Sequence, residues 1–245
     1  MNLIKFKNSI LDLFFPKRCI SCGKYKTYFC KSCFNKIKLA ETNSCPICER
    51  PIPYGSLCKT CQKKTYLNYL SWAVNYRNPI IKKLIKIFKY HFIKELADPL
   101  SMLLIKDLEK NSNILNILNP IITSIPLHKK KLRERGYNQA ELLAKRVAAY
   151  YNYQLESEIL KRKIYTLSQS QIKNHQTRKE NLKNAFEINP KFIKKCQKQN
   201  KNLLKNKIVI LVDDVFTTGA TLSEAAKVLR KGGAKEIWGL VVAKG

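Results

Sequence analysis

Two acids and a turn of small, hydroxyl-bearing residues form the part of this sequence with the most specific chemistry. Asp213 and Asp214 come directly after an apolar, β-branched run at 208–212, which is typical of a strand buried on both faces of a parallel sheet. A helical pattern of apolar residues begins after the turn and ends at two glycines, 232–233. The turn itself consists of Thr217, Thr218, Gly219, Ala220 and Thr221.

A turn of this kind between a buried strand and the start of a helix is suited to an anion. Free backbone N–H groups and the helix dipole attract a phosphate, and the threonine hydroxyls add donors. The two carboxylates can accept hydrogen bonds from neighbouring hydroxyls of a polyol, so the pattern indicates a ribose 5-phosphate. An ordinary strand–turn–helix with a capping threonine is the alternative, and the agreement of several positions disfavours it.

Eight of the nine cysteines occur as four C-x2-C pairs, a spacing that lets both thiolates of a pair face one tetrahedral Zn²⁺. Four pairs supply two closed four-sulfur sites, which are structural because no position is left open for water. We expect the first pair to combine with the second and the third with the fourth; a cross-braced arrangement would use the same residues. A redox role is less favoured, and Cys196 stands alone. The predicted ligands are Cys19, Cys22, Cys30, Cys33, Cys45, Cys48, Cys58 and Cys61.

A basic loop is predicted after a strand at 121–125. Strands and crossover helices alternate beyond residue 64, which predicts an α/β fold with a parallel sheet and a ligand site at the carboxyl ends of the strands. The basic loop therefore emerges at the same edge as Asp213, where its cations could bind pyrophosphate; a merely solvated turn is the alternative. His128 is either a phosphate donor or a strand-end side chain. The candidate pyrophosphate ligands are Lys129, Lys131, Arg133 and Arg135, with Lys130 beside them.

The remaining segments complete the expected fold. A polar stretch from Lys161 to Phe186 has no periodicity, and a loop of this length is typical of a lid or a disordered segment. The lysine- and asparagine-rich stretch at 189–206 is expected to be a surface insertion. Apolar patterns further predict a strand at 70–76 and helices at 80–88, 95–109 and 140–151.

The formal net charge is +30, which favours polyanionic partners such as nucleic acid, an anionic membrane or phosphorylated ligands. A merely soluble basic surface is the alternative. The N-terminal segment has no long apolar core or small-residue cleavage site and is typical of a short amphipathic helix. No run reaches the eighteen or so apolar residues needed to cross a bilayer. We therefore expect a cytoplasmic protein, in which thiols stay reduced.

The stretch at 207–221, KIVILVDDVFTTGAT, closely resembles the phosphoribosyl-pyrophosphate (PRPP) motif of type I phosphoribosyltransferases. The resemblance implies that Asp213 and Asp214 hold the ribose 2- and 3-hydroxyls. It implies that residues 217–221 wrap the 5-phosphate. Mg²⁺ is expected to bind with PRPP, bridging its pyrophosphate and ribose hydroxyls.

Nearly the whole chain resembles the ComF family of competence proteins, of the ComFC type. The resemblance rests, in order, on the cysteine pairs, SIPLHKKKLRERGYNQAELLAKRVA, QSQIKNHQTRKENLKNAF and VDDVFTTGATLSEAAKVLRKGGAKEIWGLVVAKG. It implies a double zinc ribbon, preceded by the short amphipathic helix, at 1–64. A type I phosphoribosyltransferase domain is then expected at 65–245.

The family resemblance implies PRPP binding and the handling of single-stranded DNA during natural transformation, with DNA-uptake proteins or a helicase as candidate partners. A catalytically active phosphoribosyltransferase acting on a base or amine is the alternative. The PRPP motif is intact, which favours an enzyme, but no nucleobase-reading segment is recognisable. Aromatic residues near cations could stack bases in a DNA-binding groove: Tyr25, Tyr28, Tyr66 and Tyr90.

Overall fold

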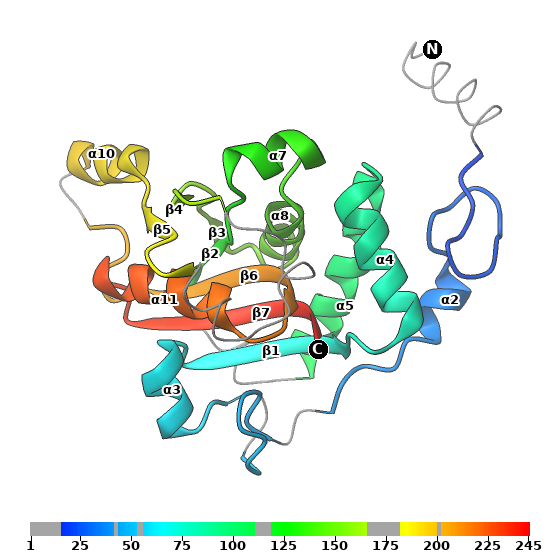
Figure 1. Cartoon of the computed structure of the whole chain (residues 1–245), viewed down its shortest axis with the longest axis horizontal. Coiled ribbons are helices and arrows are strands. Elements are labelled where there is room, and N and C mark those ends of the chain that lie inside the picture. Colours follow the sequence, from blue (N-terminus) through cyan, green and yellow to red (C-terminus); the bar gives the residue numbers. More distant parts are fainter. Residues whose placement is uncertain (1–15, 42–43, 53–55, 111–118, 166–181, 200–201) are drawn as a thin grey trace.

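The protein is built around a five-stranded parallel sheet with the strand order β1–β7–β6–β2–β3 (Figure 1). The central strand β6 pairs with β7 on one side and β2 on the other, and the apolar run at 208–212 lies within it. The strands are β1 (Tyr69–Asn75), β2 (Ile121–Ser124), β3 (Gln154–Leu155), β6 (Ile208–Phe216) and β7 (Glu236–Lys244). The structure is a computed structural model and describes residues 16–41, 44–52, 56–110, 119–165, 182–199 and 202–245.

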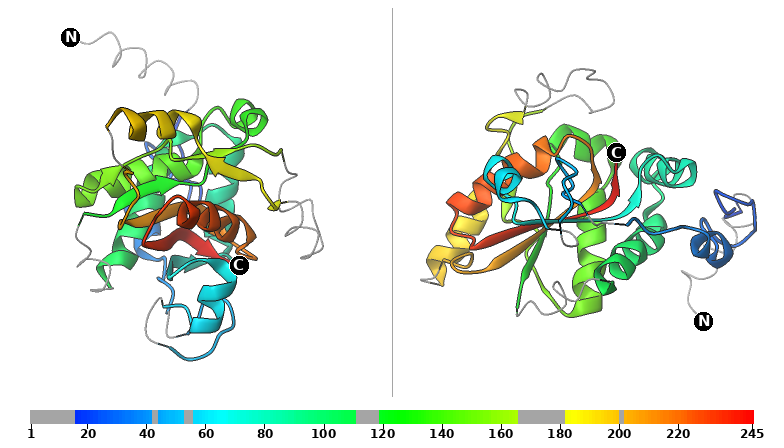
Figure 2. Two further views of the ribbon diagram at one scale, coloured as in Figure 1. Left: turned by 90° about the vertical axis from the view of Figure 1, so that its left-hand side faces the viewer. Right: turned by 90° about the horizontal axis from the view of Figure 1, so that it is seen from below.

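Helices cover both faces of the sheet, which explains why its strands are apolar on both sides (Figure 2). Helices α5 and α8 pack on one face, with α4 beside them, and α11 and α3 pack on the other. The helices are α2 (Lys31–Asn35), α3 (Lys59–Thr65), α4 (Pro79–Tyr90), the 3-10 turn η1 (Lys94–Leu96), α5 (Ala97–Glu109), α7 (Lys129–Arg135), α8 (Gln139–Tyr151), α10 (Pro190–Lys198) and α11 (Ala220–Lys231).

Helix α4 has a clear start signal and a buried stripe. The Asn78 side chain caps it by accepting from the backbone N–H of Ile80 at 2.9 Å, and Pro79 occupies the first helical position. Its buried residues recur at helical spacing, which holds the helix against the core. They are Ile81, Leu84, Ile85 and Phe88.

A second, two-stranded antiparallel sheet lies beside α11 and pairs β4 (Leu160–Arg162) with β5 (Phe186–Ile188). These strands form the two ends of the stretch expected to be a lid or a disordered segment, and residues 166–181 of that stretch lie outside the described residues. The stretch expected to be a surface insertion contains α10, a largely exposed helix whose Phe192 is buried together with Leu204. The lysines of α10 concealed this apolar anchor in the sequence pattern.

The two cysteine-rich segments lie on opposite sides of the same sheet (Figure 2). Residues around Cys19 and Cys33 share a hydrophobic cluster with α4 and α5, whereas those around Cys45 and Cys61 share one with α11. Figure 1 shows the first segment, with α2, near α4, and the second segment, with α3, below β1. The chain between them covers the open edge of β1, where the Ala40 N–H donates to the carbonyl of Ala73 at 2.8 Å.

The predicted α/β fold and parallel sheet are confirmed, while one local prediction is wrong. The basic segment after β2 is a helix, α7, instead of a loop, because the His128 side chain caps its start and Gly136, at φ +70°, ends it. The boundary proposed near Lys64 falls in the last turn of α3. The amphipathic helix expected at the N-terminus falls within residues 1–15, outside the described residues.

Candidate functional site

The turn between β6 and α11 forms the floor of the candidate site. β6 continues through both acids to Phe216, and α11 begins at Ala220 after Gly219. Gly219 has φ +74°, and a Cβ atom there would lie 2.6 Å from the Phe216 ring, so only glycine fits this turn. Thr218 Oγ1 accepts a hydrogen bond from the Ala220 backbone N–H, with 3.4 Å between the oxygen and the nitrogen. The turn therefore presents the N-terminus of a twelve-residue helix at the carboxyl end of β6.

The two acids differ in their partners. Asp214 is buried, and its Oδ1 lies 2.7 Å from Lys89 Nζ of α4. Burial opposes the charge of Lys89, but the Asp214 carboxylate outweighs it and raises the pKa of Lys89. Asp213 is half-buried, and its Oδ1 accepts from the Asp214 backbone N–H at 2.8 Å. Burial, helped by the charge of Asp214, raises the pKa of Asp213 to about 7.

Cations from α7 and β4 face these acids. Lys131 is buried, and its burial together with repulsion from Arg162 and Arg135 lowers its pKa to about 8. Burial also lowers the pKa of Arg162, although the negative charge of Asp213 acts in the opposite direction. The cations thus surround the carboxyl edge of β6 with positive charge that is partly desolvated, which suits a multiply charged anion.

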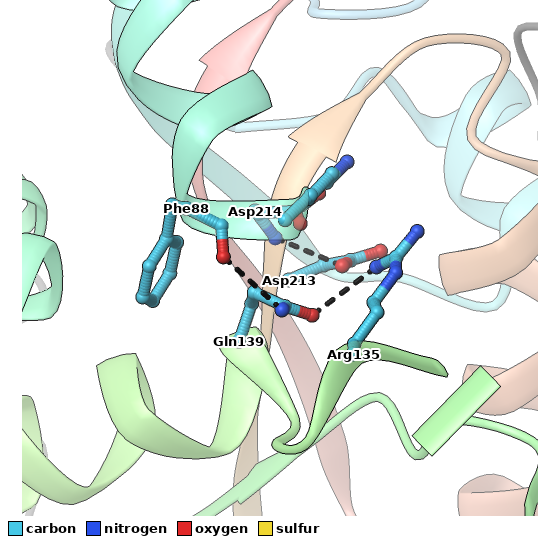
Figure 3. A network of polar contacts seen from close by, with 6 residues as sticks. Phe88, Arg135, Gln139, Asp213 and Asp214 are labelled. Atoms are coloured by element: carbon cyan, nitrogen blue, oxygen red, sulfur yellow. Dashed lines mark hydrogen bonds and ion pairs between the residues drawn. The ribbon is translucent and has the colours of Figure 1, made fainter. Parts of the chain in front are cut away.

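A chain of hydrogen bonds joins α4 to α7 beside the acids (Figure 3). The carbonyl of Phe88, in the last turn of α4, accepts from Tyr137 Oη at 2.6 Å and from Gln139 Nε2 at 3.2 Å. Gln139 Oε1 accepts in turn from Arg135 Nη1 at 3.1 Å. Since the last carbonyls of a helix have no intrahelical donor, these side chains cap α4 and fix the direction of Arg135.

The structure brings together only part of the predicted basic set. Lys131 and Arg135 lie at the site, whereas Lys129 and Arg133 lie on the exposed face of α7. His128 acts as a helix cap: its Nδ1 accepts from the Lys130 backbone N–H at 3.3 Å. This contact favours the strand-end interpretation over the phosphate donor.

Lys89, Arg162 and Gln139 are site residues that the sequence analysis did not identify. Lys89 carried a usable signal, because it follows the buried Ile81 and Ile85 at two successive steps of four and so continues their face of α4. Arg162 and Gln139 carried none, since only the tertiary fold places them near Asp213.

The eight paired cysteines form two four-sulfur clusters. One holds Cys19, Cys22, Cys30 and Cys33, the other Cys45, Cys48, Cys58 and Cys61, and all sulfurs of a cluster lie within 4.8 Å of one another. This is the sequential arrangement favoured by the sequence. Cys22 and Cys30, like Cys48 and Cys58, have sulfurs 3.6 Å apart. Tetrahedral zinc with bonds of about 2.3 Å needs about 3.8 Å between sulfurs, so both sets fit a structural zinc ion.

Backbone groups favour the thiolate forms of Cys19 and Cys45. For Cys33, a hydrogen bond with Ser21 is outweighed by burial and the neighbouring cysteines, which raise its pKa to about 11. Burial alone would raise the pKa of Cys19, but N–H groups of Cys30, Cys22 and Ser21 outweigh it and lower that pKa to about 6. The pKa of Cys45 is lowered to about 6 in the same way, with burial opposed by the N–H groups of Cys48, Cys58 and Ile47. Such N–H···S contacts around a cysteine pair stabilise a bound metal as well as the thiolate.

A parallel sheet with a glycine-containing turn and helix start after its central strand, joined to two four-cysteine clusters, defines a zinc-ribbon protein with a phosphoribosyltransferase-type domain. The double zinc ribbon domain family matches residues 10–62, and the phosphoribosyl transferase domain family matches residues 135–244. No helix among the described residues has both the length and the apolar character required for a membrane span.

Similar proteins cover nearly the whole chain. "Competence protein F" of Haemophilus influenzae is 32% identical over 242 residues, which are 93% of this chain and 97% of that protein. "DNA utilization protein YhgH" of Escherichia coli is 30% identical, covering 85% of this chain and 88% of that protein. "Competence protein ComFC" of Bacillus subtilis is 27% identical, covering 85% and 80%. The chain belongs to the ComF family of competence proteins.

Purification without chelator should yield two zinc ions per chain, because each sulfur cluster offers a complete tetrahedral set. Cys19→Ser and Cys45→Ser should each reduce the content to one ion, as measured by elemental mass spectrometry. Cys196→Ser is the matched control, since Cys196 belongs to neither cluster, and it should keep both ions. A zinc content near zero in the unaltered protein would contradict both sites.

Proposed function

We propose that this protein binds PRPP and handles single-stranded DNA in the cytoplasm during natural transformation. The observation that carries PRPP binding is the pairing of two carboxylates, Asp213 and Asp214, with the glycine-containing turn at the start of α11. One part suits a diol and the other suits a phosphate, and they lie a few residues apart on one strand–turn–helix unit.

PRPP would be held by three groups of residues. Asp213 and Asp214 accept hydrogen bonds from the ribose 2- and 3-hydroxyls, while residues 217–221 surround the 5-phosphate. Lys131 and Arg135 of α7 bind the pyrophosphate, which their partly desolvated charges favour. Mg²⁺ would enter with the ligand beside Asp213 and Asp214 and would neutralise part of the pyrophosphate charge.

Replacing Asp213 by Asn and Asp214 by Ala should weaken PRPP binding in calorimetry with Mg²⁺. Each lost hydrogen bond to a charged group costs about 1.5–3 kcal/mol, so the affinity should fall by at least about tenfold. Asp98→Asn alters an exposed acid that pairs with Arg146 and is the control. The single variant Asp213→Asn keeps the Lys89–Asp214 ion pair. Comparing it with the double variant therefore separates a loss of folding stability from the loss of a ligand contact. Unchanged affinity in the double variant would rule out this site.

DNA handling is proposed from the family and from charge. The relatives are named for competence and for DNA utilization, and this chain carries a net charge of +30. A surface with so many cations releases counterions when it binds a polyanion. Of the four tyrosines suggested by the sequence, Tyr25 and Tyr90 lie exposed beside arginines, with Arg18 Cζ 4.4 Å and Arg135 Cζ 5.2 Å from their ring centres.

The logarithm of the affinity for a single-stranded oligonucleotide should fall linearly with the logarithm of salt concentration. Counterion release sets a slope of about 0.7 per phosphate neutralised on single strands. Fluorescence anisotropy with a labelled thymidine oligomer from about 50 to 300 mM NaCl measures it. Polyglutamate, an acidic polymer without bases, serves as the control for charge alone. Equal affinity for both polymers would show that the protein does not recognise DNA.

Catalytic phosphoribosyl transfer is a second candidate, and the pKa of Asp213 favours it. A carboxylate with a pKa of about 7 is suited to take a proton, at neutral pH, from the base or amine that receives the phosphoribosyl group. PRPP incubated with the protein and a panel of bases and amines should then release pyrophosphate with one acceptor, and Asp213→Asn should abolish the release. No release across the panel would leave a PRPP-binding protein without transferase activity.

A further inference from the structure

Exposed apolar side chains concentrate around α7. Among the described residues eleven large apolar side chains are exposed, and four of them belong to this seven-residue helix or contact it. Leu132 lies in α7, Tyr165 lies beside its start, and Tyr90 and Phe92 lie beside its end. Apolar groups gathered on one patch of surface indicate a binding surface more strongly than scattered ones do.

Cations of α7 stack on two of these rings. Lys130 Nζ lies 4.8 Å from the centre of the Tyr165 ring, whose edge also meets His128 at 5.4 Å between ring centres. Arg135 Cζ lies 5.2 Å from the centre of the Tyr90 ring. One contact is near each end of the helix, so the rings flank α7 and remain open to solvent.

Phe92 has an unusual backbone conformation for an exposed aromatic residue. Its φ is +58°, a left-handed value that bulky residues rarely adopt, and its side chain is 61% exposed. The ring reaches the end of α7, where the absence of a side chain at Gly136 leaves it room. Burial does not compensate for this conformation, which points to a role for the ring at the surface.

Helix α7 therefore has two faces with different chemistry. Lys131 is buried near Lys89, Arg135 and Arg162, and its Nζ also lies 5.7 Å from the centre of the Tyr165 ring, whereas Lys129, Lys130 and Arg133 are exposed. The outer face combines exposed cations with flat rings, and that combination suits a strand whose bases are unpaired. A duplex would satisfy the cations but would hide the faces of its bases from the rings.

We propose that single-stranded DNA binds on the α7 platform, formed by the rings of Tyr90, Phe92 and Tyr165 and the cations Lys129, Lys130 and Arg133. Bases stack on the rings, and phosphates pair with the cations. The proposal rests on the DNA handling proposed above and assigns it to a surface at the rim of the PRPP site. The DNA strand would then run next to Arg135, which contacts the Tyr90 ring of the platform and is also a candidate ligand of the PRPP site.

Ring substitutions test the stacking. Tyr90→Ala, Phe92→Ala and Tyr165→Ala should each weaken binding of a fluorescein-labelled twenty-residue thymidine oligomer by about 5- to 150-fold in anisotropy titrations. The salt dependence should keep its slope, because the rings carry no charge. Tyr165→Phe should bind like the unaltered protein, since it retains the ring. Tyr150→Ala, an equally exposed tyrosine on α8, is the matched control.

Charge substitutions test the phosphate contacts separately. The triple variant Lys129→Gln, Lys130→Gln, Arg133→Gln should reduce the salt slope by about 2, from three lost phosphate contacts at about 0.7 each. Lys82→Gln, Lys86→Gln, Lys110→Gln changes two exposed lysines of α4 and one that follows α5, and is the charge-matched control, with the slope unchanged. Because all these positions are exposed, zinc content and thermal unfolding should stay those of the unaltered protein.

The outcomes separate this proposal from the function it rests on. If the unaltered protein does not bind the oligomer, DNA handling itself is wrong. If it binds and the ring and charge variants bind equally well, the strand lies elsewhere and the α7 platform is wrong. Loss of binding confined to Tyr25→Ala would place the strand on the first ribbon and would equally overturn the proposal. Loss in the α7 variants with the controls intact supports it.

Discussion

The ion pair between Lys89 and Asp214 is the contact on which the site depends. Asp214 is buried at the end of the central strand, and an unpaired buried charge destabilises a fold by about 3–5 kcal/mol. Lys89, in the helix α4, neutralises this buried charge. The contact therefore ties α4 to β6, and with them the capped carbonyl of Phe88 and the direction of Arg135.

The parts of the site that are local in sequence could be predicted, and the parts that depend on tertiary contacts could not. Asp213 and Gly219 belong to one strand–turn–helix unit whose spacing carries its chemistry. The cysteine clusters follow from C-x2-C spacing in the same way. Lys89 and Arg162 reach the acids from separate elements, and no local pattern encodes that meeting. Lys129 and Arg133 have the positive charge that a pyrophosphate ligand needs, but they lie on the exposed side of α7, a helix where the sequence had predicted a loop.

The sheet was predictable for a similar reason, and the placement of the ribbons was not. Apolar runs and helical stripes report burial directly, so α8 and α11 were expected near their observed bounds, whereas β6 continues past the expected end at residue 212 to Phe216. Nothing in the cysteine spacing indicates which face a ribbon packs on. The structure places the first ribbon with α4 and the second with α11, so each metal cluster extends a different half of the core. The small apolar content of the ribbons explains why they pack against the sheet.

The pairing of β1 with β7 joins two strands from opposite ends of the phosphoribosyltransferase-type domain, and it has a consequence for synthesis on the ribosome. The cysteine segments emerge first and can fold around metal early. β1 then waits, because its partner β7 is made after every other strand. Until that moment its inner edge exposes unpaired backbone groups that could pair with another nascent chain. The segment carrying Ala40, which covers the outer edge of β1, leaves only one side of the waiting strand open.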